Sequence, residues 1–479
     1  MRRVLCAAFI ALCVPGAFAG DAVTAFRPGK PPPPEALQHV AVKAVVAEFL
    51  DADATALGKE LGYLVWREIL TAISDQRGAG VIIAHPPGNE RLVDLLRQSY
   101  HQAALQIAES QKARMAIWGA VSEQDGRVAV DTYLSLLGEA TREELALKVS
   151  WAEPGKPARD SGLAARISRT RFNFTRVWTT REALFTRPLL VQRNNTAVRE
   201  RPAAGKTLHR AAAGETLQAD GMQGEWFQVR LRGGARGYVR AWDVHVPPRR
   251  IEALRSEPLR EHPASKAKRA GGAGANASYA VLASRYVAGS GLWYRIAAPD
   301  GEGWIRASAV RAQFSFPVVH FAAGLYRYQL GRYADAAREF EQFTRVADAA
   351  ADPPGVSTAY QLLGASRLMQ GLGGELPGRA FEQAVRITPF DAGAYALRAL
   401  STLASEQSVG SALPDIARAL EHDPDNADAR ATLARMQALS TRADPRLPLR
   451  LRADVMGEQG RFVRERIDQL AREHRITAN

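Results

Sequence analysis

The stretch TAVRERPAAGKTLHRAAAGETLQADGMQGEWFQVRLRGGARGYVRAWDV, residues Thr196 to Val244, has the pattern of a small all-β domain. It contains short runs of β-forming residues separated by turns that carry glycine. A second version follows, because Trp293-Tyr294-Arg295-Ile296 precedes Gly303-Trp304-Ile305 much as Trp226-Phe227-Gln228-Val229 precedes Gly237-Tyr238-Val239. The sequence therefore predicts two copies of one β module in the middle of the chain.

Both copies resemble the bacterial SH3-like (SH3b) family. Its pattern is an Asn-Val-Arg-x-x-Pro start, a glycine before the middle strand, Trp-x-x-Val, and then Gly-Trp/Tyr-Val. The first copy, residues 191–247, matches at Val198, Arg199, Pro202, Gly214, Trp226, Val229, Gly237, Tyr238 and Val239. The second copy, residues 255–311, is degenerate: Leu259, Arg260 and Pro263 stand at its opening, and we expect a Gly/Ala/Lys-rich insertion from Ala264 to Ala275. The resemblance implies binding of cell-wall peptide or of partner proteins, without catalysis.

The aromatic residues of both copies are either barrel core or a partly exposed binding strip: Trp226, Phe227, Tyr238 and Trp242 in the first copy, and Trp293, Tyr294 and Trp304 in the second. Neighbours along a strand point to opposite faces, so Trp226 and Phe227 cannot both point inward. We predict that Phe227 and Tyr238 are the more exposed aromatic residues, with nearby arginines as partners for anions. The candidate ligand-binding residues are Arg199, Phe227, Arg230, Arg236 and Tyr238.

Basic charge is concentrated on this pair of modules. The whole chain has a formal net charge of +13, and 20 Lys/Arg against 10 Asp/Glu lie between Arg187 and Val310. Such a local field favours anionic partners, for example peptidoglycan carboxylates, lipid phosphates or acidic proteins. A solvated arginine-rich surface without a ligand is the open alternative. Nucleic acid is a poor fit for a chain that we expect to be exported.

The first residues predict export. Two arginines precede an apolar run from Val4 to Val14, and Ala17-Phe18-Ala19 fits a cleavage site, so residues 1–19 are predicted to be a signal peptide. Both cysteines lie in this segment, which leaves no mature disulfide, cysteine nucleophile or cysteine-bound zinc. Residues 20–38, with four consecutive prolines, are predicted to be an extended leader. We expect a periplasmic protein without a membrane span, and secretion is the alternative.

Residues 39–152 are predicted to form an α/β docking domain. Apolar strand runs and helical periodicity alternate in the order β-α-β-α-β-β, with Glu123-Gln124-Asp125-Gly126 as a hairpin turn. The layout around Gly78–Ile83 and Ile117–Val130 resembles the N-terminal α/β domain of the periplasmic Tol-Pal β-propeller protein, which implies docking. Residues 153–190, which open with a Pro/Gly/charge break, are predicted to be a linker or connector.

From residue 316 onward, Ala, Leu and Arg recur at helical spacing. Residues 316–440 resemble tetratricopeptide repeats, in which small residues let two helices approach and aromatic residues fill the space between them. The resemblance is carried by Gly324, Tyr328, Gly331, Tyr333, Ala336, Phe340 and Phe343, then by Gly364, Phe381, Ala384 and Pro389, and then by Ala412, Ile416, Ala419 and Pro424. We expect a solenoid with a concave face for a peptide or helix of an envelope protein, followed by a capping segment at 441–479.

No pattern in the sequence predicts catalysis, a metal or a cofactor. The nine histidines are scattered without an H-E-x-x-H motif, and His85, after a predicted strand, is better explained by a structural turn than by a site. No Gly-x-Ser-x-Gly elbow occurs. The glycine-rich residues 271–276 lack the Gly-Lys-Ser/Thr end of a phosphate loop, so we expect a flexible loop there.

Together these patterns predict a multidomain α+β protein with an N-terminal α/β domain, central all-β SH3-like domains and a C-terminal all-α solenoid. The predicted function is that of an exported non-catalytic adaptor. It would bind envelope material, such as peptidoglycan, through the SH3-like pair and a protein through the solenoid. The alternative is a periplasmic regulatory module that binds only proteins.

Overall fold

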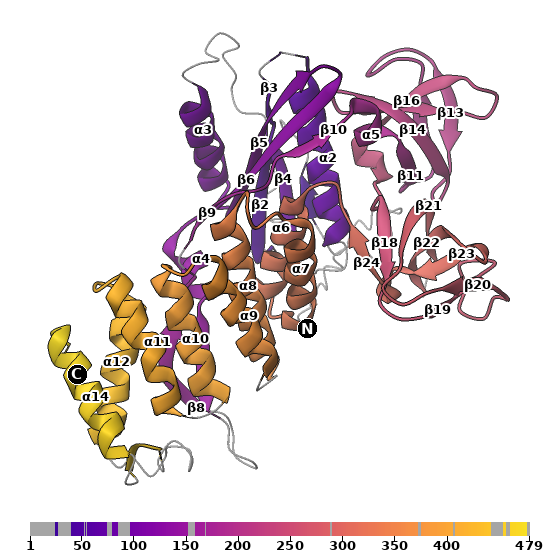
Figure 1. The fold of residues 1–479 in the computed structure, drawn as a ribbon. Helices are drawn as coiled ribbons and strands as arrows, with labels where there is room; N and C mark the ends of the chain where they lie inside the picture. The colour runs from indigo at the N-terminus through magenta and orange to yellow at the C-terminus, as the bar shows by residue number, and fades with distance from the viewer. Residues whose placement is uncertain are drawn as a thin grey trace, which may run out of the picture. The chain divides into compact units, whose positions relative to one another are not determined.

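The computed structural model (Figure 1) describes residues 24–26, 40–51, 53, 55–73, 79–84, 96–151, 159–167, 169–287, 290–371, 375–405, 408–441, 454–456 and 460–476. The predicted signal peptide, most of the proline-rich leader and His85 lie outside these residues. The chain divides into two compact units. Unit 1 spans Phe185–Ala312, and unit 2 combines Val23–Leu184 with Gln313–Asn479.

An eight-stranded mixed sheet forms the N-terminal part of unit 2, with β1, β4, β2 and β5 parallel and β6 antiparallel to β5. The central strand β2 reads VKAVVA and is nearly all buried, as expected for a parallel strand covered on both faces. The strands of this sheet are β1 (Thr24–Phe26), β2 (Val42–Ala47), β3 (Leu50–Asp51), β4 (Ala79–Ala84), β5 (Met115–Gln124), β6 (Arg127–Leu136), β9 (Arg171–Asn173) and β10 (Val177–Thr179). The predicted order β-α-β-α-β-β is therefore confirmed.

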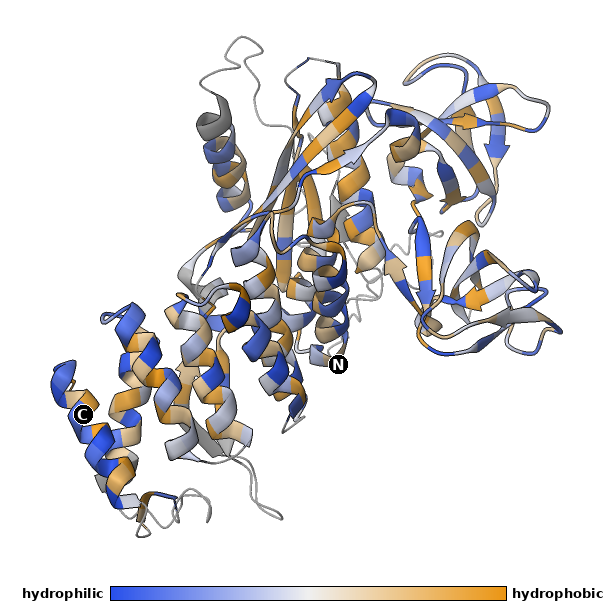
Figure 2. Ribbon diagram, in the orientation of Figure 1, coloured by the Kyte–Doolittle hydropathy of each residue, from blue (hydrophilic) through white to orange (hydrophobic). Residues whose placement is uncertain are grey.

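Three helices accompany this sheet. Every residue of α2 except Lys59 is buried, because the helix packs on the sheet and also against the first helix of the C-terminal part. Figure 2 shows hydrophobic residues along α2 and the neighbouring strands. The helices are α2 (Leu57–Ala72), α3 (Leu96–Ser110) and the short α4 (Glu139–Glu144).

The C-terminal part of unit 2 is the predicted all-α solenoid, built from successive helix pairs. Small residues face large ones within the pairs. A Cβ added to Gly324 would lie 2.6 Å from the Phe340 ring, and one added to Gly364 would lie 2.7 Å from the Phe381 ring. The helices are α6 (Pro317–Gln329), α7 (Tyr333–Val346), α8 (Pro353–Met369), α9 (Glu375–Ile387), α10 (Ala392–Ser405), α11 (Val409–His422), α12 (Ala427–Thr441) and α14 (Gly460–Glu473).

The sheet and the first repeat share one core, although the sequence predicted separate domains. Phe172 and Phe174 lie with their ring centroids 4.6 and 5.4 Å from that of Phe321 on α6. The Tyr326 hydroxyl donates to the carbonyl of Gly80 at 2.7 Å, between α6 and β4. The sheet and the first repeat each cover an apolar face of the other. The periodicity of the sequence shows that each element has an apolar face, but it does not show which element covers that face.

Unit 1 contains two β domains with the same strand order. The first β domain has the order β13-β12-β16-β15-β14-β11-β17, and the second β domain has β20-β19-β23-β22-β21-β18-β24. The strands of the first are β11 (Arg187–Val191), β12 (Thr196–Arg199), β13 (Thr207–Ala211), β14 (Thr216–Gln223), β15 (Trp226–Arg230), β16 (Arg236–Arg240) and β17 (Val244–His245). Those of the second are β18 (Arg250–Ala253), β19 (Glu257–Arg260), β20 (Arg269–Ala273), β21 (Ser278–Val287), β22 (Gly291–Ala298), β23 (Gly301–Arg306) and β24 (Val310–Gln313).

The second β domain is not interrupted by an insertion. Residues 269–273, which we expected to lie in a Gly/Ala/Lys-rich insertion and partly in a flexible loop, form β20 and pair with β19. This strand corresponds to β13 of the first β domain, which pairs with β12 in the same way. Glycines take the place of β-forming residues in β20, so the composition of this segment did not predict a strand. The strand forms because β19 provides a partner for its backbone hydrogen bonds.

Residues 153–190 are also more than a linker or connector. The strands β9 and β10 extend the sheet of unit 2, and β11 belongs to the first β domain. The segment β8 (Arg159–Ala165) pairs with β7 (Leu147–Trp151) in a separate two-stranded sheet. The helix α5 (Arg181–Phe185) precedes β11. The apolar alternation from Phe172 to Trp178 indicates a strand or an amphipathic connector, and β9 and β10 lie there, whereas local alternation did not predict β8 or β11.

The structure confirms the predicted fold class, with its α/β part, its central all-β part and its all-α solenoid. In the described part of the chain, none of the helices combines the length and apolar character that a membrane span requires.

Candidate ligand-binding cleft

Each β domain carries a tryptophan stacked with an arginine on the outer face of its sheet. Trp226 on β15 pairs in register with Arg240 on β16, whose guanidinium carbon lies 4.8 Å from the indole centroid. Trp293 on β22 pairs in the same way with Arg306 on β23, at 5.2 Å. A cation over an indole face gains about 0.5–2 kcal/mol, so the ring holds each guanidinium in place. The duplication thus fixes one cation at the same position in each domain.

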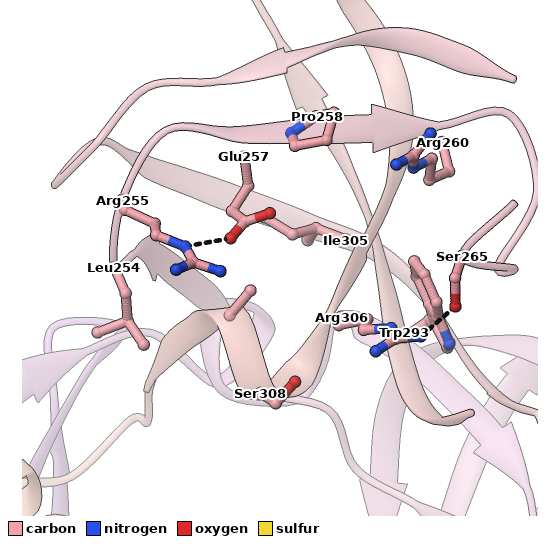
Figure 3. Close-up of a pocket in the computed structure, with 11 residues that line it drawn as sticks. Leu254, Arg255, Glu257, Pro258, Arg260, Ser265, Trp293, Ile305, Arg306 and Ser308 are labelled. Atoms are coloured by element: carbon pink, nitrogen blue, oxygen red, sulfur yellow. Dashed lines mark hydrogen bonds and ion pairs between the residues drawn. The ribbon is translucent and has the colours of Figure 1, made fainter. Parts of the chain in front are cut away.

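The second β domain is hollowed beside its pair to give a cleft of about 570 Å³. Figure 3 shows Arg255 and Glu257 at one end, and Arg260, Ser265 and Arg306 near Trp293 at the other. The lining residues are Leu254, Arg255, Glu257, Pro258, Arg260, Ser265, Trp293, Ile305, Arg306, Ser308 and Ala309. The cleft therefore combines guanidinium and hydroxyl donors with an aromatic ring and a proline.

Short contacts position these donors. Arg255 Nε donates to Glu257 Oε1 at 2.6 Å, and Arg260 Nη1 donates to the Ala267 carbonyl at 3.0 Å. Arg306 Nη2 donates to the hydroxyl of Ser265. Three guanidiniums line the cleft against one carboxylate, which leaves two positive charges in excess. Planar guanidiniums bind carboxylates and phosphates in a forked geometry, so the cleft suits a small anionic group with an apolar neighbour.

Four of the five predicted site residues lie together on the outer face of the first β domain. Tyr238 pairs in register with Arg199, and Arg236 pairs with Arg230. Arg230 and Arg236 are exposed, and both reach Asp220, at 3.3 and 3.4 Å. Tyr238 and Arg199 are half-buried. Whether these residues bind a ligand stays a prediction.

The expectation that Phe227 is exposed is wrong. Its side chain is 0% exposed in the core of the first β domain, beside Val229. Trp226, its neighbour, lies on the opposite face as alternation requires, yet it is only 5% exposed because Arg240 covers it. Alternation separates the two faces correctly, but it does not reveal that the outer aromatic residue is covered by an arginine.

Of the aromatic residues that the sequence offered as core or as a binding strip, Trp293 lines the cleft. The five candidate ligand-binding residues all lie in the first copy, because the second copy departs from the SH3b pattern. Register makes Arg260 the counterpart of Arg199, since each pairs with an aromatic residue, Trp304 or Tyr238. Arg306 is the counterpart of Arg240, and Ser308 stands where the first β domain has Trp242. The recurring Arg after the Gly-Trp/Tyr-Ile/Val motif was the available signal.

A buried polar cluster of titratable groups lies in the solenoid. His320 Nδ1 lies 2.9 Å from Glu339 Oε2, and Arg327 contacts the same carboxylate. The cluster is enclosed between α6 and α7, where it ties two helices together. Across the described ranges, no group of three or more His, Cys, Asp or Glu side chains is arranged to hold a metal ion.

Comparisons with known proteins agree with the β-domain assignment. Residues 194–245 match the model of the bacterial SH3 domain. No curated protein matches the chain. Solved structures with partial similarity include NlpC2 from Trichomonas vaginalis, at 12% identity over 27% of this chain and 48% of that chain, with a TM-score of 0.16. They also include MamA from Desulfovibrio magneticus RS-1, at 20% identity over 33% of this chain and 76% of that chain, with a TM-score of 0.24. The chain thus spans about half the length of the NlpC2 structure.

Proposed function

We propose that this protein is an exported, non-catalytic adaptor of the bacterial cell envelope. Its β domains would hold an anionic envelope polymer, and its solenoid would hold a protein. The observation that carries the proposal is the cleft of the second β domain, which three guanidiniums, two hydroxyls and the indole of Trp293 line together. The peptides of peptidoglycan offer carboxylates beside small apolar side chains, which are the groups that such a cleft complements.

Two further observations support an anionic ligand. The segment from Arg187 to Val310 carries 20 basic against 10 acidic residues, so the cleft lies within a positive field that attracts anions from a distance. The match of residues 194–245 to the bacterial SH3 domain is typical of envelope proteins. A periplasmic location follows from the proposal, since its ligand is exposed there.

A binding role, rather than a reaction, accounts for the lining of the cleft. The lining residues include two serines but neither a histidine nor a cysteine, and the carboxylate of Glu257 is paired with Arg255. A serine nucleophile needs a base within hydrogen-bond reach. The groups around Trp293 are therefore donors for an anion, and the mechanism we propose is linkage. Two weak contacts made by one chain reinforce each other through effective concentration.

The test is co-sedimentation of the chain from Gly20 onward with purified peptidoglycan sacculi, at low and high salt. We expect binding that high salt weakens, because the attraction is between exposed charges. The variant Arg255→Gln/Arg306→Gln should bind at least about tenfold more weakly, since each charge-assisted hydrogen bond contributes about 1.5–3 kcal/mol.

The matched control is Arg285→Gln/Arg295→Gln, which removes the same charge from exposed positions of β21 and β22 that do not line the cleft. This control should weaken binding only by the contribution that comes from the net positive charge of the domain. Equal losses in both variants would assign the binding to the general field and not to the cleft. An absence of sedimentation at either salt concentration would contradict the proposal and favour a regulatory module that binds only proteins.

A further inference from the structure

The β7–β8 hairpin lies on the solenoid and not on the sheet of its own chain segment. Its two strands pair only with each other, in a separate two-stranded sheet. They pack against the first helices of the last repeats: β7 against α10, and β8 against α10 and α12. Figure 1 shows β8 alongside α10. A two-stranded hairpin alone is only marginally stable in water, so packing against the helices must stabilise it.

One face of the hairpin is apolar and covered. Register places Leu147 opposite Ala165 and Val149 opposite Leu163, so these four side chains share a face. Each of them is at most 2% exposed, as is Ile167 just beyond β8. Lys148, on the other face, is exposed. The surface of α10 and α12 that the hairpin covers, called the groove below, therefore carries an extended segment with alternating apolar residues.

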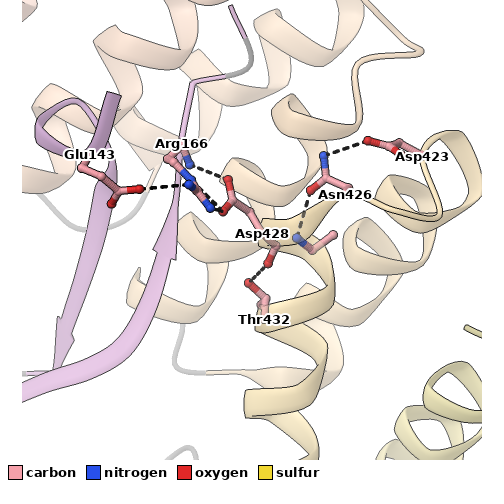
Figure 4. A network of polar contacts seen from close by, with 7 residues as sticks. Glu143, Arg166, Asp423, Asn426, Asp428 and Thr432 are labelled. Carbon is pink, nitrogen blue, oxygen red and sulfur yellow. Dashed lines mark hydrogen bonds and ion pairs between the residues drawn. The ribbon is translucent and has the colours of Figure 1, made fainter. Parts of the chain in front are cut away.

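A single arginine fixes the position of the hairpin in this groove. The backbone N–H of Arg166 donates to Asp428 Oδ2 at 2.8 Å, while its Nε and Nη2 donate to Oδ1 at 3.2 and 3.0 Å. Its Nη1 donates to Glu143 Oε1 at 2.9 Å. Figure 4 shows this network at the start of α12, where Asn426 Oδ1 accepts from the backbone of Ala429. Asp428 thus recognises an extended backbone and an arginine side chain at once.

We propose that the groove of α10 and α12 is a binding site for an extended, arginine-bearing segment, and that the β7–β8 hairpin occupies it in cis. A partner segment of the same chemistry, with apolar residues alternating before an arginine, binds by displacing the hairpin. At the last repeats, the helices that we expected to be open to a partner thus already carry a segment of the chain itself. A tethered occupant acts at a high effective concentration, so a free segment binds weakly until the hairpin opens.

This inference rests on the solenoid half of the proposed function and is independent of the cleft. Neither the hairpin nor α10 and α12 belongs to unit 1. Loss of sacculus binding would therefore leave the inference intact, and failure of the groove would leave the cleft intact.

The experiment measures binding of a fluorescent peptide of residues 159–167, RDSGLAARI, to the whole chain by anisotropy. The variant Arg166→Ala removes the side chain of the cis occupant but keeps Asp428 in the groove. We expect it to bind the peptide at least about tenfold more tightly than the wild type does, because one competitor has been weakened. A peptide with alanine in place of its second arginine should bind neither protein.

Hydrogen exchange on the same samples reports the hairpin directly. In Arg166→Ala the amides of residues 147–151 and 159–165 should exchange faster, while those of α10 and α12 keep their protection. The control Arg176→Ala removes another bidentate arginine, which holds Asp131 at 2.8 Å in the sheet, and it should match the wild type in both assays.

Unchanged exchange of the hairpin in Arg166→Ala, together with unchanged peptide binding, would overturn the inference. If Arg166→Ala also exposes α10, the isosteric variant Asp428→Asn replaces it in the exchange measurement. The hairpin should then exchange faster without any gain in peptide binding, because the groove has lost its own carboxylate. Wild-type protection of the hairpin in that variant would equally overturn the inference.

Discussion

At the scale of single residues, Glu339 shows how burial and charge compete. Burial alone raises the pKa of this carboxyl group, but Arg327 and His320 together outweigh that effect and hold the pKa below its ordinary value. His320 Nδ1 lies 2.9 Å from the carboxylate, and the backbone N–H of Phe314 donates to Nε2 at 3.5 Å, so Nδ1 is the donor to Glu339. The ionised form of Glu339 therefore stabilises the folded state.

Glu339→Gln should lower the free energy of unfolding at neutral pH by about 3 kcal/mol, because it leaves the charge of Arg327 uncompensated. The folded pKa lies below the unfolded one, so this contribution is present above the unfolded pKa and is lost as pH falls through the folded pKa. The difference between variant and wild type should shrink below about pH 4. Urea unfolding at several pH values, followed by circular dichroism, measures it.

The control for this prediction lies on the same helix. Glu341 pairs with Arg345 at 3.0 Å on a more exposed part of α7. Glu341→Gln should change stability by less than about 0.5 kcal/mol, as surface pairs do. A pH-independent loss in Glu339→Gln would show that the carboxyl group acts by shape and not by charge.

At the scale of elements, the fit between helices depends on glycines placed against rings. Gly364 on α8 faces Phe381 on α9, and an added Cβ would lie 2.7 Å from that ring. Gly378 on α9 has nothing within 4 Å of the same added atom. The two glycines differ in surroundings although both lie within helices.

Gly364→Ala should therefore destabilise the solenoid by about 1–3 kcal/mol through overpacking. Gly378→Ala should stabilise it by about 0.4–1 kcal/mol, because alanine restricts the unfolded chain and favours a helix. Thermal unfolding of both variants beside the wild type measures the two signs. Stabilisation by Gly364→Ala would mean that the α8–α9 pair can separate without cost.

Sequence spacing predicted the helices of the solenoid, and alternation predicted the central strands of the β domains, β15 and β16 in the first and β22 and β23 in the second. Alternation also placed Trp226 and Phe227 on opposite faces. It could not predict that Arg240 covers Trp226, since that contact depends on cross-strand register. Nor could it predict β20, whose glycines have low β propensity and form a strand only because β19 offers a partner. The cleft depends on the same kind of cross-strand register, which places Arg306 of β23 beside Trp293 of β22.

At the scale of the whole molecule, unit 2 is built from two segments separated by unit 1 in the chain. The helix α2 is buried along almost its whole length, between the sheet and α6. Ser315 Oγ donates to Glu68 Oε1 of α2 at 2.7 Å, and Arg327 Nη2 donates to the Ala72 carbonyl at 2.7 Å. Each segment therefore completes the core of the other.

Residues 23–184 produced alone should aggregate, because α2 and the phenylalanines that face Phe321 would be exposed to water. Co-expression with residues 313–479 as a separate chain should give a soluble complex that co-purifies. Tagging one segment and measuring recovery of the other by size-exclusion chromatography tests this expectation. A soluble residue 23–184 segment with its own cooperative unfolding would contradict it.

By itself, the sequence determined the chain's classes of local structure: the strand and helix periods, the duplicated Trp and Gly-aromatic motifs, the repeated small residues and the basic surplus of the middle segment. These are properties of neighbouring residues, and they follow from the geometry of strands and helices. Only the tertiary structure decided which faces meet. It buried Phe227, opened the cleft beside Trp293, joined two distant segments in one core and laid the β7–β8 hairpin on the solenoid. The physical reason is that such contacts form between residues far apart in the chain, and local pattern does not encode which partner removes an apolar face from water.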